Sequence, residues 1–442
     1  MPDLLVKCMA VLTMDGEEDI IRDGEIAVRG DKIYHVGQAG STPGDFQPER
    51  VLEYPGMVAM PGFVNCHTHA AMTLLRGYAD DLPLMQWLRE KIWPLEEHLT
   101  PEDIYYGTLL CCAEMIRGGT TTFADMYFAM EQVAQAVDES GMRAVLSRGM
   151  IGLGPNADKA MEESRAFIAR WQGGAGGRVT TMFGPHAPYT CPPEYLQKVM
   201  SAAQELGVGI HIHLAETAGE VREIKEKYGK SPVALMEEIG LFALGLPVLA
   251  AHCVHLDDND VAILARRRVG IAHNPQSNMK LASGVAPVSR LLEAGAVVGL
   301  GTDGAASNNN LDMLEEMRAA ALLQKVHTGD ATALPAYTAL RMATAEGARV
   351  LGLGDRIGRI KPGLQADIIL LDMRQPHLYP LFDLYAHVAY AAASSDVHTV
   401  IIDGKVVMEN RRILTLDEEA VLDQAQRAAE ALLRRKEVRG NG

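Results

Sequence analysis

Two histidines two residues apart, His67 and His69, end an apolar segment that begins at Met57 and is interrupted only by Pro61-Gly62. We interpret this segment as a buried strand. Because side chains alternate between the two faces of a strand, both histidines point to one side and can bind one ion together. Neutral imidazole is the commonest protein ligand for a catalytic divalent metal such as zinc. An isolated pair also arises by chance, so this interpretation depends on further ligands elsewhere.

Further polar residues stand at the ends of later apolar segments. His213 and Glu216 follow one such segment. His252 ends the next one, and Asp303 follows the last. A single polar residue at a strand end usually only faces a loop or caps a helix. In a barrel of parallel strands, however, the carboxyl ends of all strands meet at one mouth, so the convergence of these side chains predicts a metal site there.

The elements that position these residues alternate between short apolar strands and longer helical stretches, which is the pattern of parallel βα units. Eight strands with eight crossovers is the count of a closed (β/α)₈ TIM barrel, so we predict an α/β fold of this kind. The eight strands are expected to end near His69, Asp125, Arg148, His186, His213, His252, Asn274 and Asp303.

Both chain ends are expected to build a second, small β domain of sandwich type. Apolar runs flanking Gly30-Asp31 and Asp403-Gly404 predict one hairpin near each end. A final helix is expected over residues 416–438, with Thr415 and Glu418 as a capping box. The predicted parts are residues 1–56 for the N-terminal part of the small domain, 57–362 for the catalytic barrel, and 363–442 for the remainder of the small domain with the final helix.

Composition narrows the class of protein. The formal net charge of −16 over 442 residues argues against a nucleic-acid partner and for an enzyme with a small substrate. No apolar run is long enough to span a bilayer, and the start of the chain lacks the pattern of a signal peptide, so a cytoplasmic protein without membrane contact is expected. The six cysteines show no CxxC spacing and are expected to be free thiols.

Over nearly its whole length the chain resembles the amidohydrolase superfamily. The motifs that carry the resemblance are residues 61–69, 213–216, 251–253 and 301–304. The resemblance implies that one metal ion per subunit is bound by His67, His69, His213 and Asp303. Binuclear members add a carboxylated lysine at the end of the fourth strand, where this chain has no lysine. Zn²⁺ is the expected ion, and a set of three histidines and one aspartate also suits Fe²⁺ or Mn²⁺.

The predicted chemistry follows from charge placement. A divalent metal lowers the pKa of its bound water and generates hydroxide near pH 7. Asp303 can accept the released proton, and His252 can orient the hydroxide. Glu216 is expected to protonate a ring nitrogen of a heterocycle, which fits hydrolytic deamination with loss of ammonia. The alternative for Glu216 is an acid at a helix N-terminus that only interacts with the helix dipole.

Within the superfamily the chain looks most like the 5′-methylthioadenosine/S-adenosylhomocysteine deaminases, on segments 71–82, 87–88, 184–189, 273–281 and 303–309. By that resemblance, Glu96 binds the ribose hydroxyls of a nucleoside substrate and His186 lies beside the sugar. Arg148 meets the 5′ substituent, because arginine pairs well with a carboxylate. Trp87, Ser307 and Glu216 are the other expected substrate contacts. Without the resemblance, Glu96 could equally be a solvated acid.

One difference between this chain and those deaminases affects which substrate is expected. Relatives that accept S-adenosylhomocysteine well can use a second arginine in the loop after the third strand, but here residues 154–160 contain Lys159 and no arginine. This favours 5′-methylthioadenosine, with S-adenosylhomocysteine and adenosine as further candidates. The alternatives are an aminohydrolase of the same scaffold acting on guanine-type bases or s-triazines and, more remotely, a metal-free scaffold protein. The resemblance also implies a homo-oligomer.

Overall fold

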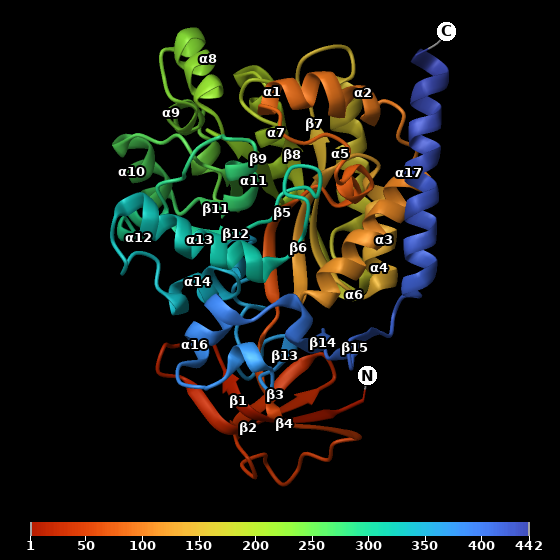
Figure 1. Cartoon of the computed structure of the whole chain (residues 1–442). Helices are drawn as coiled ribbons and strands as arrows, with labels where there is room; N and C mark the ends of the chain where they lie inside the picture. The colour runs from red at the N-terminus through yellow and green to blue at the C-terminus, as the bar shows by residue number, and fades with distance from the viewer. Residues whose placement is uncertain (1, 441–442) are drawn as a thin grey trace.

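The computed structural model describes residues 2–440 and has a parallel eight-stranded barrel at its centre (Figure 1). The predicted TIM barrel is confirmed, and each strand ends within a few residues of its expected position. Buried apolar runs form these strands because both faces of a parallel sheet are covered. The barrel strands, in hydrogen-bonded order, are β5 (Phe63–Thr68), β6 (Thr120–Tyr127), β7 (Arg143–Met150), β8 (Val179–Pro185), β9 (Gly209–Leu214), β10 (Val248–His252), β11 (Gly270–His273) and β12 (Val297–Leu300).

Helices in the connections surround the barrel, and local signals set where several of them begin. Thr100 and Asp103 form a capping box at the start of α3, with Pro101 in its first turn, and Asp257 and Asp260 do the same for α10. The helices of this layer are η1 (Ala70–Leu75), α1 (Leu84–Trp87), η2 (Leu88–Ile92), α2 (Trp93–Glu96), α3 (Pro101–Arg117), α4 (Met130–Ser140), α5 (Ala157–Trp171), α6 (Gly174–Gly177), α7 (Pro193–Leu206), α8 (Ala218–Tyr228), α9 (Pro232–Glu238), η3 (Leu241–Ala243), α10 (Asp258–Arg267), α11 (Pro275–Lys280), α12 (Val288–Glu293), α13 (Met313–Thr328), α14 (Ala336–Met342) and α15 (Ala345–Val350).

The barrel closes between its first and last strands, β5 and β12. The Asn65 side-chain amide donates to Thr302 Oγ1 at 2.7 Å and accepts from the Thr302 backbone at 3.0 Å. One residue later, the Asp303 N–H donates to the His67 carbonyl at 2.9 Å. Gly301 permits this approach, because a Cβ there would lie 2.8 Å from the His67 nitrogen. Closure therefore brings the two ends of the predicted site together.

A second sheet, built from both chain ends, lies below the barrel in Figure 1. Both predicted hairpins are present, as β2–β3 and β14–β15. Ile33 near one end of the sheet and Val406 near the other belong to the same apolar cluster, so the sheet encloses its own small core. Its strands, in spatial order, are β16 (Arg412–Ile413), β15 (Lys405–Glu409), β14 (Val397–Ile402), β13 (Ile368–Asp372), β4 (Arg50–Pro61), β1 (Leu4–Leu12), β2 (Ile20–Arg29) and β3 (Lys32–Gln38).

The structure divides the apolar segment before His67 at Gly62. Residues up to Pro61 pair with β13 of the small sheet, and Phe63 begins the barrel. The turn is tight, because a Cβ on Gly62 would lie 2.1 Å from the Thr121 side chain. The two sheets are also joined by Arg143 of β7, whose buried guanidinium donates to Asp367 and Asp403 at 2.7–3.1 Å. The small domain is thus fastened directly to the barrel.

The last helix, α17 (Glu418–Gly440), runs along one side of the barrel against α3 (Figure 1). The helix was predicted, but its capping box was wrong. Thr415 Oγ1 donates to the Ser140 carbonyl of α4 at 2.7 Å, and Asp417 instead accepts from the Ala420 N–H. A tertiary contact has replaced the local one. The remaining short helices, between β13 and β14, are η4 (Pro376–Leu378), α16 (Leu384–Ala386), η5 (His387–Ala391) and η6 (Ser394–Asp396).

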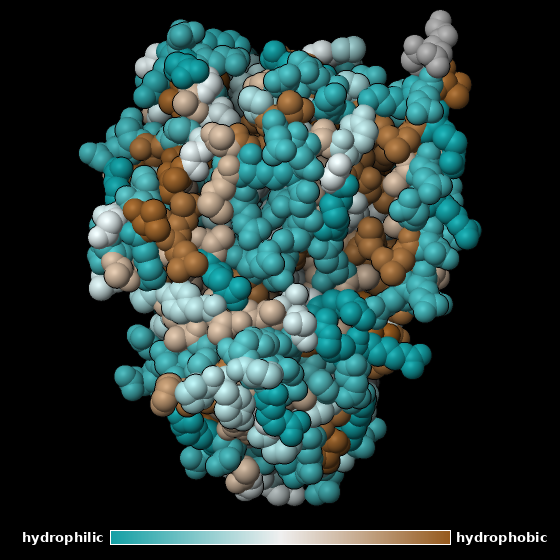
Figure 2. Space-filling model, in the orientation of Figure 1, coloured by the Kyte–Doolittle hydropathy of each residue, from teal (hydrophilic) through white to brown (hydrophobic). Residues whose placement is uncertain are grey.

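The surface is consistent with the composition. Hydrophilic residues cover most of the face shown in Figure 2, and hydrophobic residues gather in small groups, one of them beside α17. Among the residues that the structure describes, no helix is both long enough and apolar enough to cross a membrane. All six cysteines are free thiols, as expected, and all are buried.

Candidate functional site

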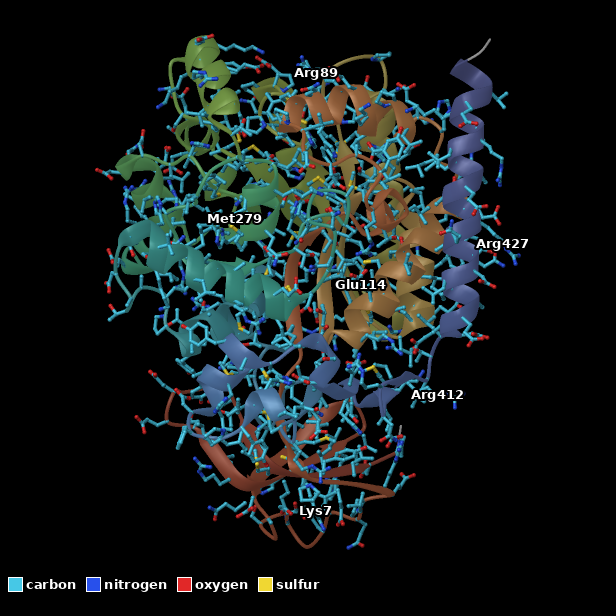
Figure 3. The ribbon with its side chains drawn as sticks, viewed as in Figure 1. Lys7, Arg89, Glu114, Met279, Arg412 and Arg427 are labelled. Atoms are coloured by element: carbon cyan, nitrogen blue, oxygen red, sulfur yellow. The ribbon has the colours of Figure 1, made fainter. Side chains whose placement is uncertain are left out.

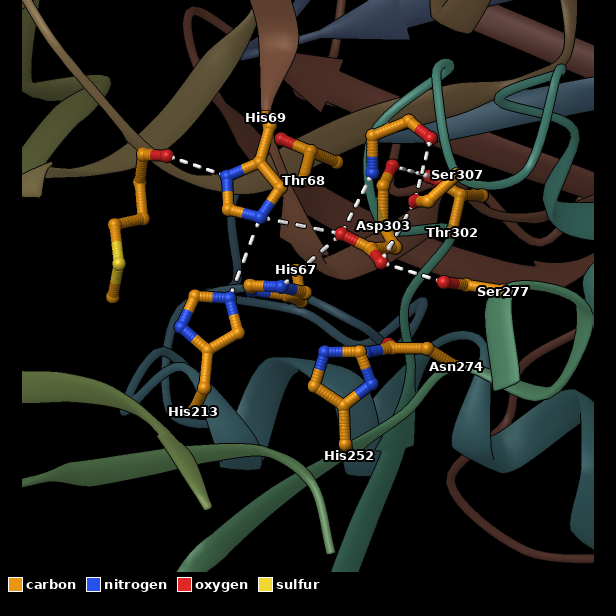
Figure 4. Close-up of polar contacts among 12 residues, drawn as sticks. His67, Thr68, His69, His213, His252, Asn274, Ser277, Thr302, Asp303 and Ser307 are labelled. Atoms are coloured by element: carbon orange, nitrogen blue, oxygen red, sulfur yellow. Dashed lines mark hydrogen bonds and ion pairs between the residues drawn. The ribbon is translucent and has the colours of Figure 1, made fainter. Parts of the chain in front are cut away.

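Three imidazoles and a carboxylate meet at the carboxyl end of the barrel strands (Figure 4). Asp303 Oδ1 lies 3.4 Å from His67 Nε2 and 3.3 Å from His69 Nε2. His213 Nε2 lies 3.4 Å from His69 Nε2. For bonds of 2.0–2.1 Å to a tetrahedral metal, neighbouring donor atoms are roughly 3.4 Å apart. The spacing of these four side chains therefore fits a single divalent ion.

The hydrogen bonds of His69 and His213 leave the Nε2 atom of each ring free to bind a metal. His69 Nδ1 lies 2.6 Å from the Met126 carbonyl, and His213 Nδ1 lies 2.8 Å from the His186 carbonyl. A carbonyl can only accept, so both Nδ1 atoms carry hydrogen and both Nε2 atoms keep a lone pair. Burial lowers the pKa of His213 well below its ordinary value, which keeps the ring neutral, as a metal ligand must be.

A chain of hydrogen bonds sets the same tautomer at His67. Ser147 Oγ donates its only proton to the Asp125 carbonyl at 2.8 Å and so accepts from His211 Nδ1 at 3.1 Å. His211 Nε2 then accepts from His67 Nδ1 at 2.8 Å. This leaves His67 Nε2 with a lone pair, and that buried atom has no hydrogen-bond partner among the described residues. A buried nitrogen without a partner is costly unless an ion meets it.

His211 is therefore expected to support metal binding without contacting the metal. Replacing His211 with Phe removes the acceptor for His67 Nδ1–H, and loss of such a partner typically weakens metal affinity about 10–100-fold. Competition with a chelator measures the change. His377→Phe is the matched control, because His377 bonds Asp396 in the small domain, away from the site. Equal affinities in the two variants would contradict this role for His211.

Asp303 is held from the side opposite the histidines. Ser277 Oγ and Ser307 Oγ donate to Asp303 Oδ2 at 2.7 and 2.8 Å, and the Gly304 N–H donates to Oδ1. Burial alone would raise the pKa of Asp303, but the proximity of the His67 and His69 imidazoles outweighs this effect and holds that pKa well below the usual value. The carboxylate is thus ionised and oriented. Ser307 lines the cavity, but its hydroxyl is engaged by Asp303 rather than pointing freely to a substrate.

The backbone at the site adopts uncommon conformations. His252 has φ of 74° and Asp303 has φ of 62°, which is the left-handed region that L residues other than Gly rarely occupy. Such conformations cost of order 1–3 kcal/mol each and persist where the surrounding structure determines them. Here each one turns a functional side chain from the end of a strand toward the barrel mouth.

Glu216 and His252 face each other beside the metal donors. His252 Nε2 lies 3.9 Å from Glu216 Oε2, while His252 Nδ1 meets Asn278 Oδ1 at 2.9 Å. Burial raises the pKa of Glu216, and the carboxylate of Asp303 adds to this effect. Burial favours neutral His252, but the carboxylates of Glu216 and Asp303 outweigh it and raise the pKa of the imidazole. The two side chains influence each other's charge, although 3.9 Å is too long for a hydrogen bond between them. His252 also lies within reach of the same ion as His67 and Asp303.

Glu220 fixes the loop that carries Glu216. Its carboxylate accepts the N–H groups of Ala215 and Glu216 at 2.9 and 2.8 Å. Burial raises the pKa of Glu220 to about 7 despite these two bonds. The Glu216 backbone is thereby held at the start of α8, so its side chain can face the cavity.

A cavity opens next to the predicted metal-binding side chains, and His69, His213 and Asp303 are part of its lining. The segment 84–93 covers it with apolar side chains, and Arg89 of this cover lies at the upper end of the barrel in Figure 3. Of the predicted substrate contacts, the ones that line the cavity are Trp87, Glu96, His186, Glu216 and Ser307. Arg148 lies outside this lining, although its neighbour Gly149 is part of it. The lining is mostly apolar with a few polar side chains, which suits a small ligand of the same character.

Glu96 and His186 are two further polar groups that line the cavity. The Tyr127 hydroxyl donates to Glu96 Oε1 at 2.5 Å. Thr190 donates to the Ala187 carbonyl and accepts from His186 Nδ1 at 2.9 Å, so His186 Nε2 keeps a lone pair. Burial, together with His69 and His252, lowers the pKa of His186 to about 4. Both groups can therefore accept hydrogen bonds from a ligand.

Sequence reasoning missed five supporting residues. One of them had a signal: His211 and His213 are two residues apart on β9, the same spacing as His67 and His69. The others are defined only by contacts between elements that are distant in the chain or by loop geometry. The missed residues are Tyr127, Ser147, His211, Glu220 and Asn278.

Comparisons with known proteins agree with this geometry. The sequence model of the amidohydrolase family matches residues 58–407. A 5-methylthioadenosine/S-adenosylhomocysteine deaminase of Pelotomaculum thermopropionicum is 64% identical over 99% of this chain and 100% of its own length. A 5′-deoxyadenosine deaminase of Methanosarcina mazei is 51% identical over 98% and 99%. A crystal structure of an adenosine deaminase from Xanthomonas campestris with bound zinc superimposes with a TM-score of 0.94 at 37% identity, covering 98% of this chain and 99% of that one.

Proposed function

We propose that this chain, which belongs to the amidohydrolase family, hydrolytically deaminates adenosine-type nucleosides of the 5′-methylthioadenosine and S-adenosylhomocysteine class. The observation that carries the proposal is that one cavity holds the metal donors and Glu216 together with Glu96. A deaminase of free bases has no need of a carboxylate on the sugar side. The relatives named as deaminases of such nucleosides support the same substrate class.

The metal is proposed to be Zn²⁺, held by His67, His69, His213 and Asp303. When bound, it supplies a water of lowered pKa, which is the nucleophile that deamination needs. Asp303 Oδ1 faces the donor nitrogens of His67 and His69 and can take a proton from that water. Its second oxygen stays fixed by two serine hydroxyls, so the carboxylate keeps its orientation as it gains the proton.

Glu216 is proposed as the acid that activates the ring. With its pKa raised by burial, it retains a proton to higher pH than an exposed glutamate does and can give it to the ring nitrogen beside the amino-bearing carbon. The added proton makes that carbon electrophilic. His252, close to Glu216, stabilises negative charge as the nucleophile adds to the carbon. The amino group then takes the proton held by Asp303 and leaves as ammonia, and the proton of the added hydroxyl returns to Glu216.

Glu96 is proposed to bind the two ribose hydroxyls, since a carboxylate can accept two neighbouring O–H groups. Burial raises its pKa, and the bond from Tyr127 and the proximity of His69 offset only part of this effect. His186 Nε2 is a second acceptor on the same side of the cavity. Trp87 and the rest of the apolar cover exclude water from the purine.

Steady-state assays of 5′-methylthioadenosine, S-adenosylhomocysteine and adenosine, with guanine as a free base, test the proposal. Glu96→Ala should lower kcat/KM for nucleosides about 10–100-fold or more, because charge-assisted hydrogen bonds are worth ~1.5–3 kcal/mol each. A 2′,3′-dideoxy analogue should be a poor substrate and respond little to the substitution. Exposed Glu97→Ala is the control. A preference of the parent enzyme for guanine or an s-triazine would overturn the proposal.

A further inference from the structure

We infer that Glu163 neutralises Arg148 and thereby makes the enzyme select nucleosides whose 5′ substituent is uncharged. The inference rests on the proposed function and refines it. Arg148 Nε and Nη2 both donate to Glu163 Oε2, at 2.9 and 2.6 Å. Nη1 donates to the Gly149 carbonyl at 2.6 Å. All three nitrogens of the guanidinium thus have a partner within the protein before any substrate arrives.

Arg148 lies next to the cavity without lining it. Its strand, β7, is the neighbour of β8, and the His186 N–H donates to the Met150 carbonyl at 2.9 Å. The carbonyl that holds the guanidinium belongs to Gly149, which does line the cavity. The arginine is therefore near enough to meet a long, charged 5′ substituent, but only after it has turned away from Glu163.

The direction of Arg148 follows from strand alternation. Ser147 points into the barrel, where its hydroxyl meets His211. The next side chain must point outward, toward the helix layer. Helix α5 follows β7 in the chain and presents Glu163 there. The pairing is therefore built into the βα unit and does not depend on a ligand.

The charged groups around Glu163 support the inference that it neutralises the charge of Arg148. Lys159 Nζ lies 3.7 Å from Glu163 Oε1, on the adjacent turn of α5. Its side chain is 71% exposed, whereas that of Arg148 is 18% exposed. An exposed pair of this kind contributes little, because solvent and salt screen it. Glu163 is therefore paired mainly with Arg148. The charge of Lys159 is exposed and screened by solvent.

The cavity wall near Arg148 is apolar. Phe128 and Ile151 line it and are 39% and 42% exposed, which places them at its mouth. Met126 lines the same region of the cavity. A methylthio group or a methyl group gains free energy by covering such side chains, at about 25 cal/mol per Å². A carboxylate would have to leave water and also displace Glu163, which is tethered beside the arginine at high effective concentration.

The test is the ratio of kcat/KM for S-adenosylhomocysteine to kcat/KM for 5′-methylthioadenosine. Glu163→Gln should raise this ratio about 10-fold or more, since Arg148 is released and can form charge-assisted bonds with the substrate carboxylate. The rise should shrink at high ionic strength. Glu162→Gln, an exposed neighbour on the same helix, is the matched control and should leave the ratio unchanged.

Adding Arg148→Ala to Glu163→Gln should abolish the gain, because the released guanidinium is its source. An unchanged ratio in Glu163→Gln, or a gain that survives in the double variant, overturns the inference. Failure of the proposed function would look different: the parent enzyme would then not deaminate 5′-methylthioadenosine at all. Thermal unfolding of each variant separates loss of folding from loss of selectivity.

Discussion

His213→Ala is expected to abolish both metal binding and deamination. We propose this imidazole as one of four protein ligands, and its Nδ1–H bond to the His186 carbonyl leaves the Nε2 lone pair free for an ion. A methyl side chain leaves that position empty, and the remaining donors cannot close around the metal. Elemental analysis of the purified variant, together with the rate of ammonia release, measures the effect.

The control is a histidine in a nearby loop. His255 Nε2 bonds the Ser283 carbonyl at 2.6 Å and takes no part in the donor cluster, so His255→Ala should retain the metal. If His213→Ala still bound a full equivalent of metal, the donor assignment would be wrong. Metal loss in both variants would instead indicate a general loss of structure, which circular dichroism would detect.

The sequence was sufficient to predict that the proposed metal-binding side chains lie close together, because their proximity follows from two geometric rules. Alternation along a strand puts His67 and His69 on one face, and a closed parallel barrel collects its strand ends at one mouth. The structure brings these residues together with His213 and Asp303, from strands far apart in the chain. Neither rule requires knowledge of any individual side-chain contact.

Contacts between long side chains could not be predicted in this way. Arg148 was expected to meet the substrate. Once the structure shows that the Ser147 hydroxyl faces the interior of the barrel, alternation along the strand places Arg148 on the outer face of β7. Its partner, Glu163, is known only once α5 has packed on that face. Similarly, Thr415 was assigned to a local cap and instead bonds Ser140 of another helix. Tertiary packing decides which of several possible partners a polar side chain takes.

Glu216→Gln is expected to retain the metal and lose most of kcat. Glutamine has nearly the same shape and can still sit against His252, but it has no acidic proton to transfer to the ring. A positioned acid–base group is typically worth ~10²–10⁴-fold, so a fall of this size in kcat is expected. KM should change much less. Exposed Glu223→Gln, on helix α8 that follows Glu216 in the chain, is the control.

A modified substrate can test whether Glu216 acts by transferring a proton to the ring. In an adenosine analogue with C–H in place of the ring nitrogen beside the amino-bearing carbon, there is no atom for Glu216 to protonate. The parent enzyme should turn this analogue over poorly, and Glu216→Gln should lower that rate little further, because the two changes remove the same step. A large additional loss would mean that Glu216 acts elsewhere, for example on the departing amino group. Nearly unchanged kcat with the natural nucleoside would exclude Glu216 from the proton path and leave the role of acid to another group beside it, such as His252.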